Sequence, residues 1–263
     1  MARREIEWRR TQIKRDKWEK KFAFLFKTVL NKQFRDLAGK IDTTNIGSQS
    51  VLLIIDKDPV EKAMISLYRN VGADFAKDQY RRLKLRSADL LTKQEDEYED
   101  VWMEEMEAYV RTQAGKKITS IVAQSREQAM KIIREKINIS TEEGWGADQL
   151  AREIKKALLT DGIEMNQWRA LRIARTEVVS ASNKGAMEGA RKTGYAMLKF
   201  WIATYDNRTR DTHLTVEEQN PKEMDEVFRV GEAEMMEPGE AVNGDFPEEI
   251  INCRCSVAFE IKD

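Results

Sequence analysis

Proline is almost absent from the first three quarters of the chain, and this distribution limits the folds that the chain can adopt. The 263 residues contain 4 prolines, of which Pro59 comes early and Pro221, Pro238 and Pro247 fall in the last quarter. Because proline interrupts both helices and sheets, its scarcity allows long uninterrupted helices. The sequence therefore divides into a helical part, ending near Gly194, and an irregular α+β part.

Apolar residues in the helical part recur at the spacing of amphipathic helices. Trp18, Phe22 and Leu25 show this spacing in the first segment. Asp58 and Pro59 form a helix start, with aspartate as the cap and proline at the first helical position. We expect helices over residues 3–38, 58–85, 95–112, 116–136, 147–159 and 166–192.

Two stretches after Gly194 alternate in the manner of β-strands. They are MLKFWIAT at 197–204 and CRCSVAFEI at 253–261, and the second places both cysteines on its apolar face. We expect the two to pair, with INCRC at 251–255 beginning the second strand and both sulfurs facing the core or His213. The predicted fold class is α+β: a mainly helical amino-terminal two-thirds, then a small carboxy-terminal α+β module with a short antiparallel sheet.

Charge is unevenly distributed, although the net charge is only -1. Residues 1–40 contain 13 Lys and Arg against 5 Asp and Glu, whereas residues 217–249 contain 12 acidic side chains against 2 basic ones. Such runs are either solvated surface or, at the basic end, a contact for DNA or an acidic partner. The polar first half also predicts that the helix over 1–40 is poorly anchored. The candidate contacts for DNA or such a partner are Arg3, Arg4, Arg9, Arg10, Lys14 and Arg15.

Membrane insertion and secretion are not expected. The longest apolar run, VLLII at 51–55, is far shorter than the roughly 20 residues that cross a bilayer. The basic start MARREIEWRR is not followed directly by the apolar region of a secretory signal. A reducing compartment is therefore expected.

The two cysteines, Cys253 and Cys255, admit two interpretations. A disulfide between them would be strained, because the ring closed by Cys-Arg-Cys is very small. Their place on an apolar strand face favours buried, inert thiols. The alternative is structural zinc, with His213 and a carboxylate such as Asp206 or Asp211 completing a tetrahedral set.

Sequence patterns give little support to catalysis. His213 is the single histidine, which excludes sites that need two, and no phosphate loop of the form GxxxxGK is present. An enzymatic alternative would be a metal-dependent nuclease or a transferase that uses Asp206, His213 and Glu177. We expect that the chain is not an enzyme and needs no catalytic cofactor.

Charged side chains on the helix at 166–192 are expected to hold the α+β part in place. Arg175 and Glu177 are interpreted as ion-pairing residues, with a ligand site as the alternative. For Arg208 we predict a forked pair with Glu177, since a guanidinium can bind both oxygens of a carboxylate.

The carboxy-terminal half also carries a series of motifs in a fixed order. They are IARTE at 173–177, Gly185, Gly194, WIAT at 201–204, DNRTRDTH at 206–213, VFRVG at 227–231, Pro238-Gly239 and INCRC at 251–255. In this order and spacing they resemble the phage head morphogenesis family typified by phage Mu protein F. The resemblance covers about residues 116–259, and its sharpest part is 172–255.

This resemblance implies a minor head protein of a tailed bacteriophage, made in the bacterial cytoplasm and placed in the procapsid and virion near the portal. Implied partners are the portal, capsid and scaffold proteins, and double-stranded DNA. We expect residues 1–94 to be a helical arm facing portal or DNA and residues 95–263 to be the Mu F-like domain. The family's motif positions, none of them catalytic, fall at Arg175, Thr176, Glu177, Asp206, Arg208, Thr209, His213, Asn252, Cys253 and Cys255.

Overall fold

The protein is mainly helical, as predicted. The computed structural model describes residues 2–46, 48–87, 94–204 and 206–262, with the side chains of residues 2–4 and 94–97 outside the description. Each predicted helix is present, and the apolar run at 51–55 belongs mostly to a short 3₁₀ helix. In chain order these elements are α1 (Ala2–Lys40), η1 (Gln49–Ile54), α2 (Asp58–Arg86), α3 (Gln94–Gln113), α4 (Gly115–Glu143), α5 (Ala147–Leu159) and α6 (Asp161–Arg191).

The carboxy-terminal part contains a small antiparallel sheet among short helices. The three-stranded sheet has the order β2-β1-β5, and β3 and β4 form a separate two-stranded sheet. The predicted pairing is confirmed, since Phe200 of β1 lies opposite Ala258 of β5. The elements are β1 (Met197–Ile202), α7 (Asp211–Leu214), η2 (Thr215–Gln219), β2 (Lys222–Glu223), β3 (Phe228–Val230), β4 (Ala233–Met235), α8 (Pro247–Ile250) and β5 (Ser256–Ile261).

The predicted start of the last strand is wrong by several residues. β5 begins at Ser256, so INCRC precedes the strand instead of opening it. The cause is Asn252, whose φ of 59° lies in the left-handed region that asparagine tolerates better than most residues. The chain therefore turns at Asn252 before it enters the sheet.

The chain folds into two units that are interleaved along the sequence. Unit 1 contains residues 1–21, 65–109 and 174–263, and unit 2 contains residues 22–64 and 110–173. Both units take segments from either side of residue 94, so the division predicted there stays a prediction. Among the described residues, no helix combines the length and apolar character that a membrane span requires.

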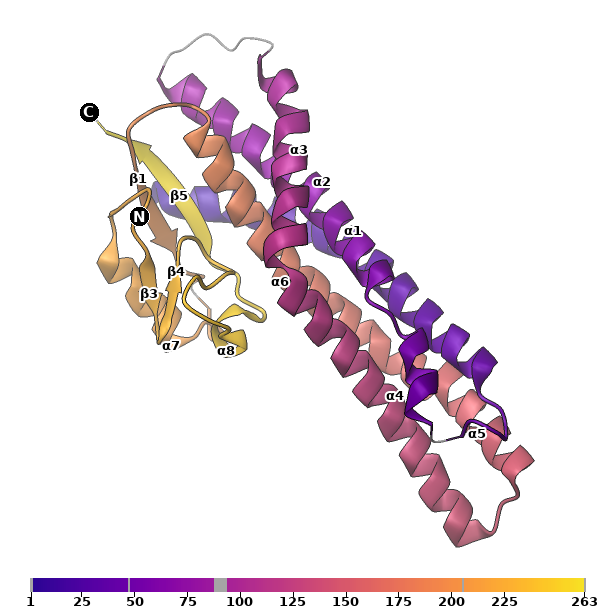
Figure 1. Cartoon of the computed structure of the whole chain (residues 1–263). Helices are drawn as coiled ribbons and strands as arrows, with labels where there is room; N and C mark the ends of the chain where they lie inside the picture. Colours follow the sequence, from indigo (N-terminus) through magenta and orange to yellow (C-terminus); the bar gives the residue numbers. More distant parts are fainter. Residues whose placement is uncertain (1, 47, 88–93, 205, 263) are drawn as a thin grey trace. The chain divides into compact units, whose positions relative to one another are not determined.

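In unit 1 the sheet packs on the carboxy-terminal half of α6. Val257 and Phe259 of β5 share an apolar cluster with Ala186 and Met187 of α6. A second apolar cluster contains Trp201 of β1, buried residues of β3 and β4, and the two cysteines. Figure 1 shows β3, β4, α7 and α8 gathered beside β1 and β5. These two clusters fix the segments that carry the sequence motifs.

Within unit 1, α2 and α6 approach so closely that only glycine fits at two positions. A Cβ added at Gly185 would lie 2.1 Å from the carbonyl oxygen of Gly72, and one added at Gly189 would lie 2.1 Å from that of Ala76. Since both obstacles are backbone atoms, no side-chain movement can relieve them. Glycine is therefore required here by packing.

Unit 2 is helical in its described part. Gly144 ends α4 in the left-handed conformation, with φ 69°, and its N–H group bonds to the carbonyl of Ser140. Arg169 of α6 binds α4 by donating to the Ile121 carbonyl oxygen at 3.1 Å and to Ser125 Oγ at 2.9 Å. Helix–helix contacts of this kind, together with buried apolar side chains, hold unit 2 together.

The prediction that the helix over residues 1–40 is poorly anchored is wrong. Its first half belongs to unit 1, where two tryptophans bond to distant segments: Trp8 Nε1 donates to Thr204 Oγ1 at 3.2 Å, and Trp18 Nε1 donates to Asp74 Oδ2 at 2.8 Å. Between them, Arg15 is fully buried. The first half of α1 is therefore attached through polar bonds, and a polar sequence pattern does not indicate weak attachment.

Candidate functional site

Three successive residues of α6, Arg175, Thr176 and Glu177, each contact a different segment of unit 1. Arg175 reaches α1, Thr176 reaches the turn before β5, and Glu177 reaches α2. The bonds are Arg175 Nε to Glu19 Oε2 at 3.3 Å, Asn252 N to Thr176 Oγ1 at 3.1 Å, and Tyr68 Oη to Glu177 Oε2 at 2.9 Å. The IARTE motif thus joins three elements to α6.

The predicted pair between Arg208 and Glu177 is wrong. Arg208 is 73% exposed in its side chain and lies 3.6 Å from the carboxylate of Asp206. The forked pair is made instead by Arg254, the middle residue of INCRC, whose Nη2 donates to Asp206 Oδ1 at 2.7 Å while Nη1 binds Oδ2. This pair, led by the Arg254 hydrogen bond, lowers the pKa of Asp206 below its usual range.

The segment 206–213 forms a compact turn that leads into α7. The Asp206 carboxylate accepts from the backbone N–H of Arg208 at 3.0 Å, and the Thr209 hydroxyl donates to the carbonyl of Thr204. Short polar side chains that bond to nearby backbone are typical of such turns. The turn places His213 in the interior, where it is 1% exposed.

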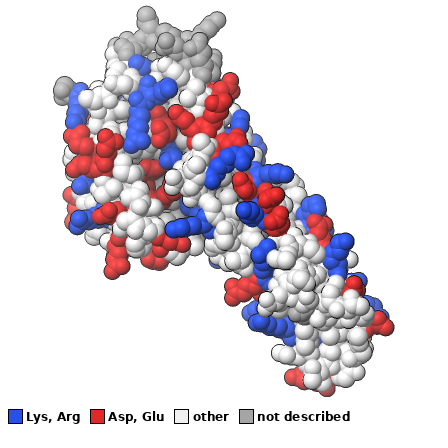
Figure 2. Space-filling view, in the orientation of Figure 1, with Lys and Arg blue, Asp and Glu red and all other residues white. Residues whose placement is uncertain are grey.

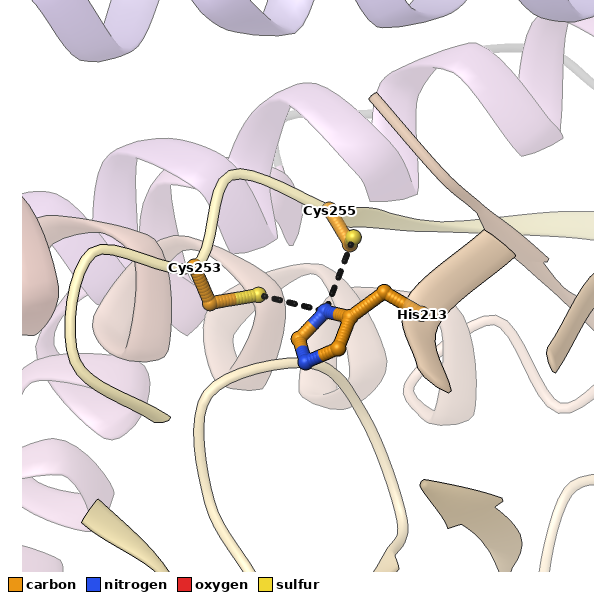
Figure 3. A group of neighbouring side chains, drawn as sticks. All are labelled: His213, Cys253 and Cys255. Carbon is orange, nitrogen blue, oxygen red and sulfur yellow. Dashed lines mark hydrogen bonds between the residues drawn. The ribbon is translucent and has the colours of Figure 1, made fainter. Parts of the chain in front are cut away.

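His213, Cys253 and Cys255 converge at one point, as Figure 3 shows. His213 Nδ1 lies 3.4 Å from Cys255 Sγ and 3.6 Å from Cys253 Sγ. All three residues are buried, and their ligand atoms lie within 4.8 Å of one another. The prediction that both sulfurs face His213 and the core is confirmed. The side chains come from α7 and from the segment before β5.

The second nitrogen of His213 bonds to Glu249, a residue that sequence reasoning missed. His213 Nε2 lies 3.0 Å from Glu249 Oε2, and Thr212 Oγ1 donates to the same oxygen at 2.9 Å. Glu249 stood within a long acidic run, which we interpreted as solvated surface. The available signal was Pro247, because proline at a helix start predicts the short helix α8 that turns Glu249 inward.

The two thiols have different proton affinities. The hydrogen bond from Cys255 lowers the pKa of Cys253 well below its ordinary value, and His213 adds to this effect. The same bond and burial raise the pKa of Cys255. Burial is the largest influence on the pKa of His213 and lowers it, but the hydrogen bond and charge of Cys253, together with the charge of Glu249, give a net upward direction. These shifts favour the thiolate form of Cys253 over that of Cys255.

A small cavity of about 10 Å³ adjoins the three side chains. Pockets that take small-molecule ligands are usually about 300–1,000 Å³, so this one can hold water but no nucleotide or peptide. His213, Cys253 and Cys255 are the residues that could hold a metal here. Asp206, predicted as a further ligand, is committed to Arg254 and is not part of the cluster.

The residues proposed for the enzymatic alternative bond to separate partners. Glu177 accepts from Tyr68, Asp206 pairs with Arg254, and both nitrogens of His213 face buried groups. Each of these side chains is therefore held by structural contacts of its own.

One of the basic residues predicted to contact DNA or the portal, Arg15, does not lie on the surface. The side chains of Arg3 and Arg4 lie outside the described residues. Arg9, Arg10 and Lys14 form ion pairs with Glu5, Asp78 and Asp74 at 2.7, 3.0 and 2.9 Å. Basic and acidic side chains are interspersed over the face drawn in Figure 2. Arg15 is excluded as a surface contact for DNA or portal, because it is buried.

A double-mutant cycle between Asp206 and Arg254 is expected to give a coupling of about 0.5–1 kcal/mol in the free energy of unfolding, the upper part of the range for surface ion pairs. The variants are Asp206→Asn and Arg254→Lys, measured by urea denaturation. A matched cycle with Arg208→Lys and Glu177→Gln is expected to give no coupling. The assignment fails if the second cycle couples more strongly than the first.

Comparison with known proteins gives two similarities. Residues 131–258 match the family described as "Phage Mu protein F like protein". Over 157 residues the chain is also 29% identical to an NAD(+)--arginine ADP-ribosyltransferase, EFV, of Enterococcus faecalis. This alignment covers 57% of the chain but only 29% of that protein. No solved structure matches the chain.

Proposed function

Residues 131–258 belong to the phage Mu protein F-like family, and from this premise we propose that the chain is a minor head protein of a tailed bacteriophage that acts in head morphogenesis near the portal. The observation that carries the proposal is the convergence of the family's motif residues. Three motif segments, residues 175–177, 206–213 and 252–255, are far apart in sequence, yet they bond to one another in unit 1.

The way these residues are used supports an assembly role over catalysis. Thr176 binds the turn at Asn252, and Arg254 of the same turn binds Asp206. These bonds hold the three motif segments together, which supports a structural use of the motif positions. A fixed surface is what an assembly protein needs, because recognition of a partner improves when the contact surface is preorganised.

The partners and location follow from the same proposal. The chain would be made in the host cytoplasm and enter the procapsid, where it would contact the portal, capsid or scaffold proteins. Arg9 and Arg10 are 68% and 62% exposed in their side chains, so they stay candidates for contact with the portal or DNA. The proposal includes a helical arm over residues 1–94 that faces the portal or DNA. It also includes a Mu F-like domain over residues 95–263.

The decisive measurement is quantitative mass spectrometry of purified procapsids and virions of the phage that encodes the chain. We expect the chain in both, at low copy number relative to the major capsid protein, since a portal-proximal protein has few places in a head. Deletion of its gene is expected to reduce the yield of DNA-filled heads. Absence from both particles, with unchanged head yield after deletion, would contradict the proposal.

The similarity to the Enterococcus faecalis protein favours one second candidate, a transferase. It is weaker because the alignment leaves most of that protein uncovered. Incubation of the purified chain with labelled NAD⁺ and arginine-containing acceptors separates the two. Label transfer that is lost in Glu177→Gln but kept in Glu188→Gln, a glutamate on the same helix, would favour the transferase over the head protein.

A further inference from the structure

We propose that His213, Cys253 and Cys255 bind one zinc ion, which fastens helix α7 to the segment that leads into β5. This inference stands independently of the role in phage heads, because it rests on the geometry of side chains in unit 1. Histidine nitrogen and cysteine sulfur are the ligands that zinc prefers in proteins.

The two separations between the histidine nitrogen and the sulfurs fit tetrahedral coordination, and all three ligand atoms lie within 4.8 Å of one another. Zinc bonds of about 2.0–2.1 Å to nitrogen and 2.3 Å to sulfur, at the tetrahedral angle, separate these ligands by about 3.5 Å. The observed separations from His213 Nδ1 are 3.4 Å to Cys255 Sγ and 3.6 Å to Cys253 Sγ. The side chains therefore need little movement to receive the ion.

Hydrogen bonding alone accounts poorly for this arrangement. Both sulfurs are directed at the same ring nitrogen, as Figure 3 shows, although Nδ1 carries one lone pair or one proton. At most one sulfur can therefore bond to this nitrogen at a time, and the other must bond elsewhere, as Cys255 does to Cys253. A metal ion at their centre would use a lone pair from each of the three.

Glu249 supplies the support that a metal-bound histidine usually has. Its carboxylate lies 3.0 Å from His213 Nε2 and is itself oriented by the Thr212 hydroxyl. Because a carboxylate accepts only, Nε2 carries the proton in the neutral ring, which leaves Nδ1 free to bind metal. Carboxylate–histidine–zinc arrangements raise metal affinity in this way.

The fourth position is assigned to a water molecule. The adjoining cavity of about 10 Å³ is lined by the three ligands and by six further residues: Thr204, Arg208, Thr209, Arg210, Asn252 and Arg254. This is near the smallest volume that holds one water. The charges also balance, since two thiolates neutralise the divalent ion, and a neutral centre suits a buried site.

The first test is the metal content and coordination of the full-length wild-type protein. We expect about one zinc per chain by mass spectrometry of metals, after expression with added zinc and purification under reducing conditions without chelator. Replacement by cobalt is expected to give the intense visible bands of a tetrahedral ion and a sulfur-to-cobalt charge-transfer band. Wild-type protein without bound zinc, or an octahedral cobalt spectrum without the sulfur band, overturns the proposal.

Variants then identify the ligands and their support. Cys253→Ser and Cys255→Ser are expected to abolish stoichiometric binding. Because serine at a buried cysteine position also disturbs packing, Glu249→Gln provides the graded test: a zinc affinity lowered about 10–100-fold. Its matched control is Glu248→Gln, the exposed neighbour on α8, with unchanged affinity. Equal affinities of the two glutamine variants would overturn the proposed role of Glu249, and unchanged binding in both serine variants would overturn the site.

Discussion

Replacing Arg15 with alanine is expected to lower the free energy of unfolding by about 3–5 kcal/mol, because several buried acceptors would lose their donor and the missing side chain would leave a cavity. The guanidinium is fully buried in unit 1 and donates to both side-chain and backbone acceptors. The bonds are Nε to Ser182 Oγ at 2.7 Å, Nη2 to Asn183 Oδ1 at 2.7 Å, and Nη1 to the Cys255 carbonyl oxygen at 3.1 Å and Ser256 Oγ at 3.0 Å.

The expected loss has two causes. Alanine would leave these acceptors buried without a donor, and it would leave a cavity where the side chain lay. Lysine is expected to restore only part of the stability, because an ammonium group cannot reproduce the planar fork. Burial lowers the pKa of Arg15 to about 10, although the nearby Cys253, Cys255 and Glu19 act in the opposite direction.

The measurement is urea denaturation of purified protein, with Arg9→Ala as the matched control. Arg9 lies on the same helix but is exposed and pairs with Glu5 one turn away, so its removal should cost well under about 1 kcal/mol. The interpretation of Arg15 as the main anchor of α1 fails if the two alanine variants are equally stable.

The second large effect is expected from Gly189→Ala, which should destabilise the protein by about 3 kcal/mol or more. Overpacking usually costs about 1–3 kcal/mol, and this case is more severe because the added methyl group would meet backbone. The new Cβ would lie 2.1 Å from the Ala76 carbonyl oxygen, so α2 and α6 would have to move apart.

Gly115→Ala provides the control for this prediction. Gly115 also lies in a helix, but a Cβ added there meets nothing within 4 Å. Alanine favours helix over glycine by about 1 kcal/mol, so this variant is expected to be as stable as the wild type or slightly more stable. Thermal unfolding followed by circular dichroism compares the two. A Gly189→Ala protein as stable as the wild type would show that the helices are not held at this distance.

Much of the fold could be predicted from the sequence because it depends on local patterns. Helical periodicity located all six long helices, and alternation located β1 and β5. The start of β5 was missed because alternation continues through Cys253 and Cys255 although the backbone has not yet joined the sheet. The left-handed Asn252 was the signal that the strand begins later.

The errors at the site have a different cause. Arg208 and Arg254 have the same chemistry, and neither periodicity nor spacing decides which of them reaches Asp206. Arg15 was placed on the surface because burial of a guanidinium depends on acceptors from remote segments. Glu249 was hidden among exposed acidic residues. Tertiary structure determines which of two chemically equivalent side chains forms a given ion pair, and a local sequence pattern contains no information about tertiary structure.

The interleaving of the two units also has a consequence for synthesis. Arg15 bonds to Ser256, which follows it by 241 residues. At about 5–20 residues per second, translation separates the emergence of these two residues by about 10–50 s. During that time the first helix has left the ribosome while the last of its acceptors do not yet exist. Completion of unit 1 must therefore be a late event in synthesis, and a chain interrupted before residue 255 would release α1 without the acceptors at Cys255 and Ser256.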